Sequence, residues 1–133
     1  MTATRHVLPL AVALLALAGC GRSGDRATVR AIAEGFYAAV DDHDGARACG
    51  WLSADARQAL ERDESAPCAR AVERLQLSGR RARRVELYVT NAAVALRGGD
   101  TVYLQDTARG WRIAAAGCRA AAYDTPADCE LQS

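Results

Sequence analysis

The hydrophobic pattern of this chain changes period once, near residue 80, and that change restricts the folds open to it. Up to Gly79 the apolar residues recur every three or four positions, as on one face of a helix. From Val85 onward apolar and polar residues alternate, as on a sheet with one buried face. Helices followed by a meander of strands predict an α+β fold, with N-terminal helices packed on an antiparallel sheet.

The first helix has the clearest signal, and it is expected to end at the DDHDG segment, residues 41–45. Three shorter helices are expected to follow. One covers residues 46–52, one begins after the capping residue Ser53, and one runs from Pro67 to Gly79. One continuous apolar stripe predicts the long first helix: Val29, Ile32, Ala33, Phe36, Tyr37 and Val40.

The alternating strands are separated by two turn signals, RGGD at residues 97–100 and TARG at residues 107–110. Residues of one parity are expected to face the helices, and those of the other parity to face solvent. The inward set is Val85, Leu87, Val89, Val94, Leu96, Val102, Leu104, Trp111 and Ile113.

An apolar run at residues 7–18 follows Arg5 at the start of the chain. Spanning a bilayer takes about 20 apolar residues, so this run is typical of a secretory signal peptide rather than of a membrane helix. It ends in Leu17-Ala18-Gly19-Cys20, which resembles the lipobox of bacterial lipoproteins. In that family the cysteine sulfur receives a diacylglycerol, and cleavage leaves the cysteine as the first residue. The alternative is an ordinary secreted protein with a chance cysteine.

The chain is therefore expected to have three parts. Residues 1–19 form a lipoprotein signal peptide, residues 20–27 a lipidated flexible tether of small and polar residues, and residues 28–133 a single α+β domain. Two acyl chains hold a protein firmly at a bilayer. The expected location is the extracytoplasmic face of the cell membrane, with the lipid bilayer as a partner through acylated Cys20.

Assigning Cys20 to lipid leaves four of the five cysteines, an even number that can pair in an oxidising compartment. Four cysteines allow three connectivities. We favour Cys49–Cys68 and Cys118–Cys129 because each closes a short local loop. A zinc site is not expected, because no C-x-x-C pair is present and the only histidine after the signal, His43, lacks a ligand-like spacing.

Loss of Arg5 with the signal leaves equal numbers of basic and acidic residues, so nucleic acid is not an expected partner. The strongest charge feature is a cluster between the last helix and the first strand. It is expected to be a solvated linker, with contact to anionic lipid headgroups as the alternative. The cluster consists of Arg80, Arg81, Arg83 and Arg84.

The C-terminal part resembles small extracytoplasmic lipoproteins of GC-rich Gram-positive bacteria. The resemblance lies in Gly110-Trp111-Arg112-Ile113, then Ala115-Ala116-Gly117-Cys118, then Cys129-Glu130-Leu131. Cysteines before Trp51 and after Pro67 fit the same family. The resemblance implies a cone like those of cystatin, nuclear transport factor 2 and ketosteroid isomerase, in which a curved antiparallel sheet wraps a long first helix. It implies little about function.

Many relatives have a pocket under such a sheet, and some use it for acid–base catalysis, which needs an inward carboxylate or histidine. Only Asp106 continues the inward parity, and it is expected either to make the following turn or to be a buried acid. His43 lies among Asp41, Asp42 and Asp44, whose spacing lacks a calcium-loop pattern, so a solvated helix end is expected. The candidate pocket residues are Phe36, Tyr37, Trp51, Asp106 and Trp111.

We therefore expect a membrane-anchored lipoprotein whose domain is a non-catalytic accessory or interaction module for an envelope protein. No catalytic residue, cofactor or metal is expected. The alternatives are a small-ligand-binding domain that uses the cone pocket and an isomerase-like or cyclase-like enzyme. Tyr88 and Tyr103 have the outward parity, and they make the outer sheet face a candidate surface for a partner or for a homodimer.

Overall fold

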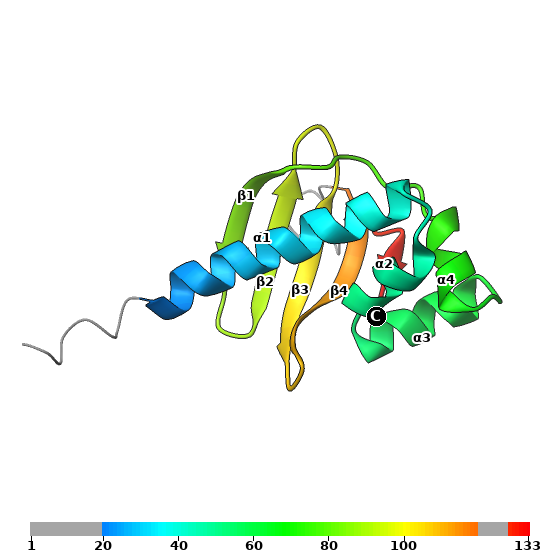
Figure 1. Cartoon of the computed structure of the whole chain (residues 1–133), viewed down its shortest axis with the longest axis horizontal. Helices are drawn as coiled ribbons and strands as arrows, with labels where there is room; N and C mark the ends of the chain where they lie inside the picture. The colour runs from blue at the N-terminus through cyan, green and yellow to red at the C-terminus, as the bar shows by residue number, and fades with distance from the viewer. Residues whose placement is uncertain (1–19, 120–127) are drawn as a thin grey trace, which may run out of the picture.

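The computed structural model describes residues 20–119 and 128–133, and it places helices before strands, which confirms the α+β prediction (Figure 1). The helices are α1 (Cys20–Asp41), α2 (Gly45–Trp51), α3 (Ala54–Asp63), α4 (Cys68–Ala71) and the 3₁₀ helix η1 (Val72–Arg74). The strands are β1 (Ala82–Leu87), β2 (Asn91–Leu96), β3 (Thr101–Thr107), β4 (Gly110–Cys118) and β5 (Leu131–Gln132).

The five strands form one antiparallel sheet in chain order, β1-β2-β3-β4-β5, which is not closed into a barrel. Helix α1 crosses one face of this sheet, and the short helices gather at the β4 and β5 end (Figure 1). The chain is fixed there by a parallel bridge between Leu52 and Ile113, where the Ser53 amide donates to the Ile113 carbonyl at 2.8 Å. The helices therefore cover one side of the sheet.

The core lies between α1 and the covered face of the sheet. Phe36 of α1 is fully buried, and the predicted stripe from Val29 to Tyr37 is buried with it. On the opposite face Tyr103 remains 40% exposed. The inward parity is confirmed for most of the strand positions: Val85, Val94, Leu96, Val102, Leu104, Trp111 and Ile113 are buried.

The predicted inward position of Val89 is wrong. Strand β1 ends at Leu87, and the Tyr88 amide donates to the Asn91 carbonyl at 2.8 Å. This hydrogen bond closes a tight turn, which carries the chain away from the covered face. The Val89 side chain is consequently 96% exposed.

The predicted flexible tether at residues 20–27 is also wrong, because α1 is helical from Cys20 onward. The extra turns have polar contacts along them. Thr28 Oγ1 donates to the Gly24 carbonyl at 2.9 Å, Asp25 accepts from the Trp111 indole, and Arg26 donates to the Val85 carbonyl. Contacts with the sheet stabilise helix that local sequence alone does not favour.

The signal peptide predicted at residues 1–19 lies outside the described residues. Within the described part of the chain, no helix has the length and apolar character needed to cross a membrane.

The helix predicted from Pro67 to Gly79 stops early. Helix α4 ends at Ala71, η1 ends at Arg74, and Leu75 adopts an extended conformation. The reason is a competing interaction, because the following segment is tied to the β2–β3 turn by hydrogen bonds between Ser78 and Asp100. The cap at Ser53 is confirmed, since its Oγ accepts from the Ala56 amide at 3.1 Å.

Among the described residues, strand β1 has a strand neighbour on one side only, and α1 supplies polar partners to its backbone. Arg26 donates to the Val85 carbonyl, and Arg30 donates to the Ala82 carbonyl at 3.5 Å. Glu34 Oε1 accepts from the Ala82 amide at 2.8 Å. These side chains, spaced four residues apart on α1, occupy backbone groups through which an edge strand could pair with another chain.

Candidate functional site

An open groove of about 900 Å³ lies between the N-terminal half of α1, the β1–β2 turn and the adjoining ends of β3 and β4. Its walls combine guanidinium groups, nonpolar side chains and carboxylates. Residues that define it are Arg22, Arg26, Leu87, Val89, Asp106 and Trp111. The groove lies at the rim of the covered face, since the centre of that face is filled by core side chains.

Trp111 and Asp106 lie opposite each other in the register between β3 and β4. The Trp111 side chain is 8% exposed, and its indole nitrogen donates to Asp25 Oδ1 at 3.3 Å. Asp106 is exposed, and within the described chain its carboxylate has no hydrogen-bond or ion-pair partner. The groove therefore presents one unpaired carboxylate next to a fixed indole ring.

Both readings of Asp106 from the sequence are wrong. It is not buried, and the turn that follows it is held by Thr107 instead. The Thr107 hydroxyl donates to the Gly110 carbonyl at 2.7 Å and accepts from the Arg109 amide at 3.1 Å. Asp106 lies one position too early in the strand for that role, so its side chain points to the groove.

The predicted pocket wall is only partly correct, because Phe36, Tyr37 and Trp51 do not line the groove. Phe36 and Tyr37 are buried, and their rings pack edge to face at 5.7 Å. Trp51 lies against α1 beside Gly35. The apolar stripe of α1 packs against the sheet, and the side chains of Phe36 and Tyr37 fill the space that was expected to be a cavity. Arg22 and Arg26 were not expected at this site, because residues 20–27 were predicted to be coil.

A buried polar network at the other end of the sheet was also missed. Asp100 is 6% exposed, and its Oδ2 accepts from the Ser78 amide at 2.7 Å and from the Tyr37 hydroxyl at 3.1 Å. The Tyr37 oxygen in turn accepts from the Gly117 amide at 3.1 Å. One carboxylate and one phenol thus join α1, the segment before β1, the β2–β3 turn and the end of β4.

Glycine makes the approach of this turn to Ser78 feasible. A Cβ atom on Gly99 would lie 1.9 Å from the Ser78 carbonyl oxygen, which no side chain tolerates. The preceding Gly98 has a φ of +67°, which favours glycine. The RGGD segment is therefore a hairpin turn, as predicted, and it also delivers a buried carboxylate.

Tyr37 gives the fold a pH dependence. Burial raises the pKa of the Tyr37 hydroxyl, and the neighbouring Asp100 carboxylate adds to the effect. In the unfolded chain a tyrosine titrates near pH 10, so the unfolded state loses its proton first as the pH rises. The stability linked to this group is complete below about pH 10. Above that value the free energy of unfolding is expected to fall by up to about 1.4 kcal/mol per pH unit.

Denaturant unfolding at a series of pH values from 8 to 11.5 checks this dependence. Tyr37→Phe should be less stable at pH 8 but should lose less stability above pH 10, because it lacks the buried phenol. Equal slopes for the wild type and Tyr37→Phe would contradict the assignment.

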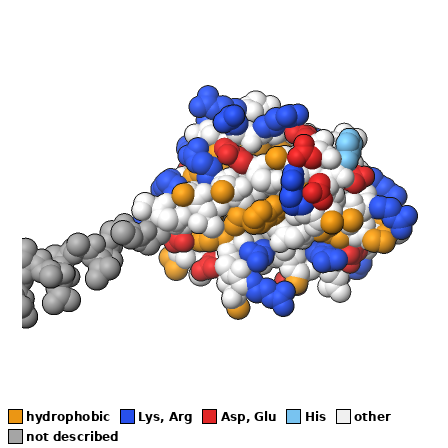
Figure 2. All heavy atoms as spheres, viewed as in Figure 1, with side chains coloured by type: hydrophobic (Ala, Val, Ile, Leu, Met, Phe, Trp, Pro, Cys, Tyr) orange, Lys and Arg blue, Asp and Glu red, His pale blue; other side chains and the backbone are white. Residues whose placement is uncertain are grey.

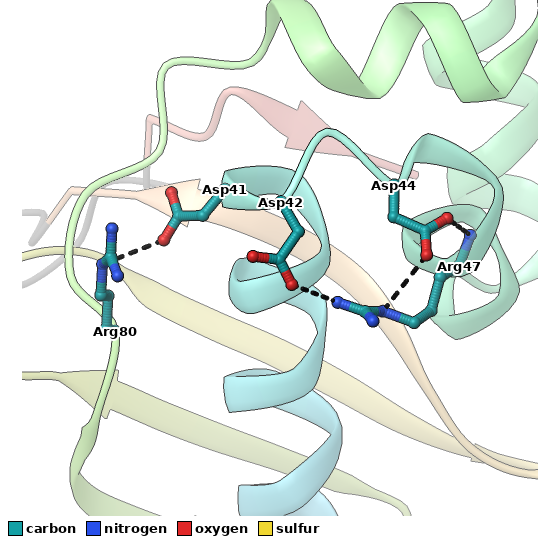
Figure 3. Close-up of polar contacts among 5 residues, drawn as sticks. All are labelled: Asp41, Asp42, Asp44, Arg47 and Arg80. Carbon is teal, nitrogen blue, oxygen red and sulfur yellow. Dashed lines mark hydrogen bonds and ion pairs between the residues drawn. The ribbon is translucent and has the colours of Figure 1, made fainter.

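The acidic residues at the end of α1 are paired with arginines (Figure 3). Arg47 reaches Asp42 at 2.8 Å and Asp44 at 3.8 Å, and Arg80 reaches Asp41 at 3.0 Å. His43 is exposed and has a φ of 56°, so it lies at the helix end where it was predicted. Across residues 20–119 and 128–133, no three His, Cys, Asp or Glu side chains are grouped so as to hold a metal ion.

The arginine cluster is only partly a linker. Arg83 and Arg84 belong to β1, while Arg80 and Arg81 precede it. Arg84 pairs with Glu86 at 3.1 Å, in addition to the Arg80–Asp41 pair. Basic and acidic side chains are interspersed over the face that α1 crosses (Figure 2). Such exposed pairs contribute little to stability.

Two disulfides have the pairing that short loops favoured. The Cys49–Cys68 bridge joins α2 to the start of α4. The Cys118–Cys129 bridge joins the end of β4 to the segment before β5. Strand β5 adds Leu131, which is buried beside Ala116 of β4. The second bridge therefore adds a covalent link to a two-residue strand that also pairs with β4.

Comparison with protein-family models, with curated proteins and with solved structures finds no match to this chain.

Proposed function

We propose that the chain is a lipoprotein of the extracytoplasmic face of the cell membrane, anchored through a diacylglycerol on Cys20. Its domain serves as a non-catalytic accessory or interaction module for a protein of the cell envelope. We further propose that its fold is related to the nuclear-transport-factor-2-like cone. A long first helix laid across an antiparallel sheet supports that relation.

The main support for the proposal is that each of the five cysteines has an assigned role. The two bridges take up four of the five cysteines, and the remaining one is Cys20 of the lipobox. Disulfides persist in oxidising compartments, which an exported protein reaches. A cysteine directly after a signal-like apolar run is the position that lipid attachment requires. The bridges and the lipobox therefore agree on export.

The filled core supports an interaction role over catalysis. Side chains such as Phe36, Leu104 and Ile113 occupy the space under the sheet, and each is at most 1% exposed. General acid–base catalysis needs a group within hydrogen-bond reach of a bound substrate. The acid nearest to such a role, Asp106, lies in the open groove at the rim.

Cys20→Ser is expected to release the protein from the membrane fraction and to prevent processing, because serine has no sulfur to acylate. Gly24→Ala is the matched control. It lies on the same helix, has open space around it and leaves the lipobox intact. Cell fractionation with radiolabelled palmitate should show label in the wild type and in Gly24→Ala only. Membrane retention of Cys20→Ser at the wild-type level would refute the anchor.

A small-ligand-binding role is the second candidate, and the unpaired carboxylate of Asp106 beside Trp111 favours it. Because side chains fill the core, such a ligand would bind in the groove at the rim of the sheet. Native mass spectrometry of protein isolated from its own membranes tests this role. A retained molecule that Asp106→Asn releases would support the role, and a protein without added mass would count against it.

A further inference from the structure

The continuity of α1 determines where the domain lies relative to its anchor, given the acylation of Cys20 proposed above. Val29 is the first buried residue among the side chains described, nine positions after Cys20. A helix rises about 1.5 Å per residue, so the core begins about 14 Å from the anchored residue. A helix holds this end of the domain near the bilayer more strictly than a coil would.

The β1–β2 turn lies at the same end of the molecule. Tyr88 and Val89 of this turn line the same groove as Arg22 of the first turns of α1 (Figure 1). Val89 is 96% exposed and Tyr88 is 62% exposed. An isolated exposed nonpolar side chain needs no explanation, but two adjacent ones beside a membrane anchor suggest an interface.

The positive charge at the N-terminal end of α1 is also compatible with contact to an anionic membrane. Arg22 is exposed and forms no ion pair within the described residues. Arg80 of the arginine cluster is instead paired with Asp41, at the other end of the 22-residue helix. That end is about 30 Å from Cys20. An arginine near an anionic membrane gains about 1 kcal/mol, and only a group close to the surface gains it.

We propose that the surface formed by Arg22, Tyr88 and Val89 docks on the headgroup region of an anionic bilayer. Arg22 contacts lipid phosphates, Val89 enters the boundary between headgroups and acyl chains, and the Tyr88 ring lies at the headgroup level, where tyrosine is enriched. The bilayer then contacts the domain through this surface, and the cluster Arg80, Arg81, Arg83 and Arg84 is not the contact.

Amide hydrogen exchange of the exported protein on vesicles tests the docking. Exchange is compared on vesicles of phosphatidylglycerol mixed with phosphatidylcholine and on vesicles of phosphatidylcholine alone. Amides of residues 88–90 are expected to exchange about fivefold more slowly on the anionic vesicles, because only there does Arg22 add about 1 kcal/mol to the docking. Arg22→Gln should remove this difference, and Val89→Asp should also abolish it, because anionic headgroups repel the new carboxylate.

Matched controls separate docking from general effects. Tyr103→Asp also places a carboxylate at an exposed nonpolar position, but on the outer face of β3, and should behave as the wild type. Arg83→Gln removes an exposed arginine of the arginine cluster and should also leave the exchange difference unchanged. Equal exchange on both vesicles, or slowing confined to residues 80–84, would overturn the proposal. The mass of the same protein reports acylation, so failure of the anchor is distinguished from failure of docking.

Discussion

Replacing Asp100 by alanine is expected to lower the free energy of unfolding by about 2–4 kcal/mol. The carboxylate is the shared acceptor for the Ser78 amide and the Tyr37 hydroxyl, and its side chain is buried. Its removal leaves two donors without their acceptor, and each such loss costs about 1–3 kcal/mol. The Ser78 connection to the β2–β3 turn should loosen as well.

Denaturant unfolding of Asp100→Ala beside Asp106→Ala measures this effect. Asp106 is exposed and has no side-chain partner within the described residues, so its replacement should change stability by less than about 0.5 kcal/mol. Asp100→Asn should lie between the two, because the amide retains an acceptor oxygen but loses the charge. Equal stability of the Asp100 and Asp106 alanine variants would show that the network contributes nothing.

Removal of the Cys49–Cys68 bridge is expected to cost about 3 kcal/mol. The bridge closes a loop with a sequence separation of 19, and a loop of that size implies about this loss in the chain-entropy model. Both sulfurs are buried among the helices, so the double variant Cys49→Ala, Cys68→Ala also loses some packing. The short helices α2 and α4 have little intrinsic stability without the bridge.

Thermal unfolding of the double variant, with and without a thiol reductant, provides the measurement and its control. Reductant should destabilise the wild type further than the variant, because the variant retains only the Cys118–Cys129 bridge. A variant as stable as the wild type under oxidising conditions would contradict the structural role of the bridge.

Periodicity predicted the parts of the fold that local sequence determines. The stripe from Val29 to Tyr37 and the alternation around Val94, Val102 and Ile113 each specify one buried face, and the structure buries those faces. The errors have long-range causes. Residues 20–27 are helical in a segment that contacts Trp111, 86 positions from Asp25, and the helix after Pro67 gives way to an extended segment bonded to Asp100.

The candidate site was predicted less completely. Asp106 and Trp111 followed from strand parity, and both line the groove. Parity could not show that Phe36 and Tyr37 would fill the space under the sheet, because that depends on how closely α1 approaches the sheet. Asp100 had no distinguishing signal, since an aspartate beside two glycines is ordinary in a turn.

The intact mass of the protein extracted from its own membranes tests the central proposal most directly. We expect a chain that begins at Cys20, carries the added mass of a diacylglycerol on that residue, and has the four other cysteines oxidised in two bridges. Fragmentation should place the lipid on the first residue. A chain that begins elsewhere, or one with an unmodified thiol at Cys20, would contradict it.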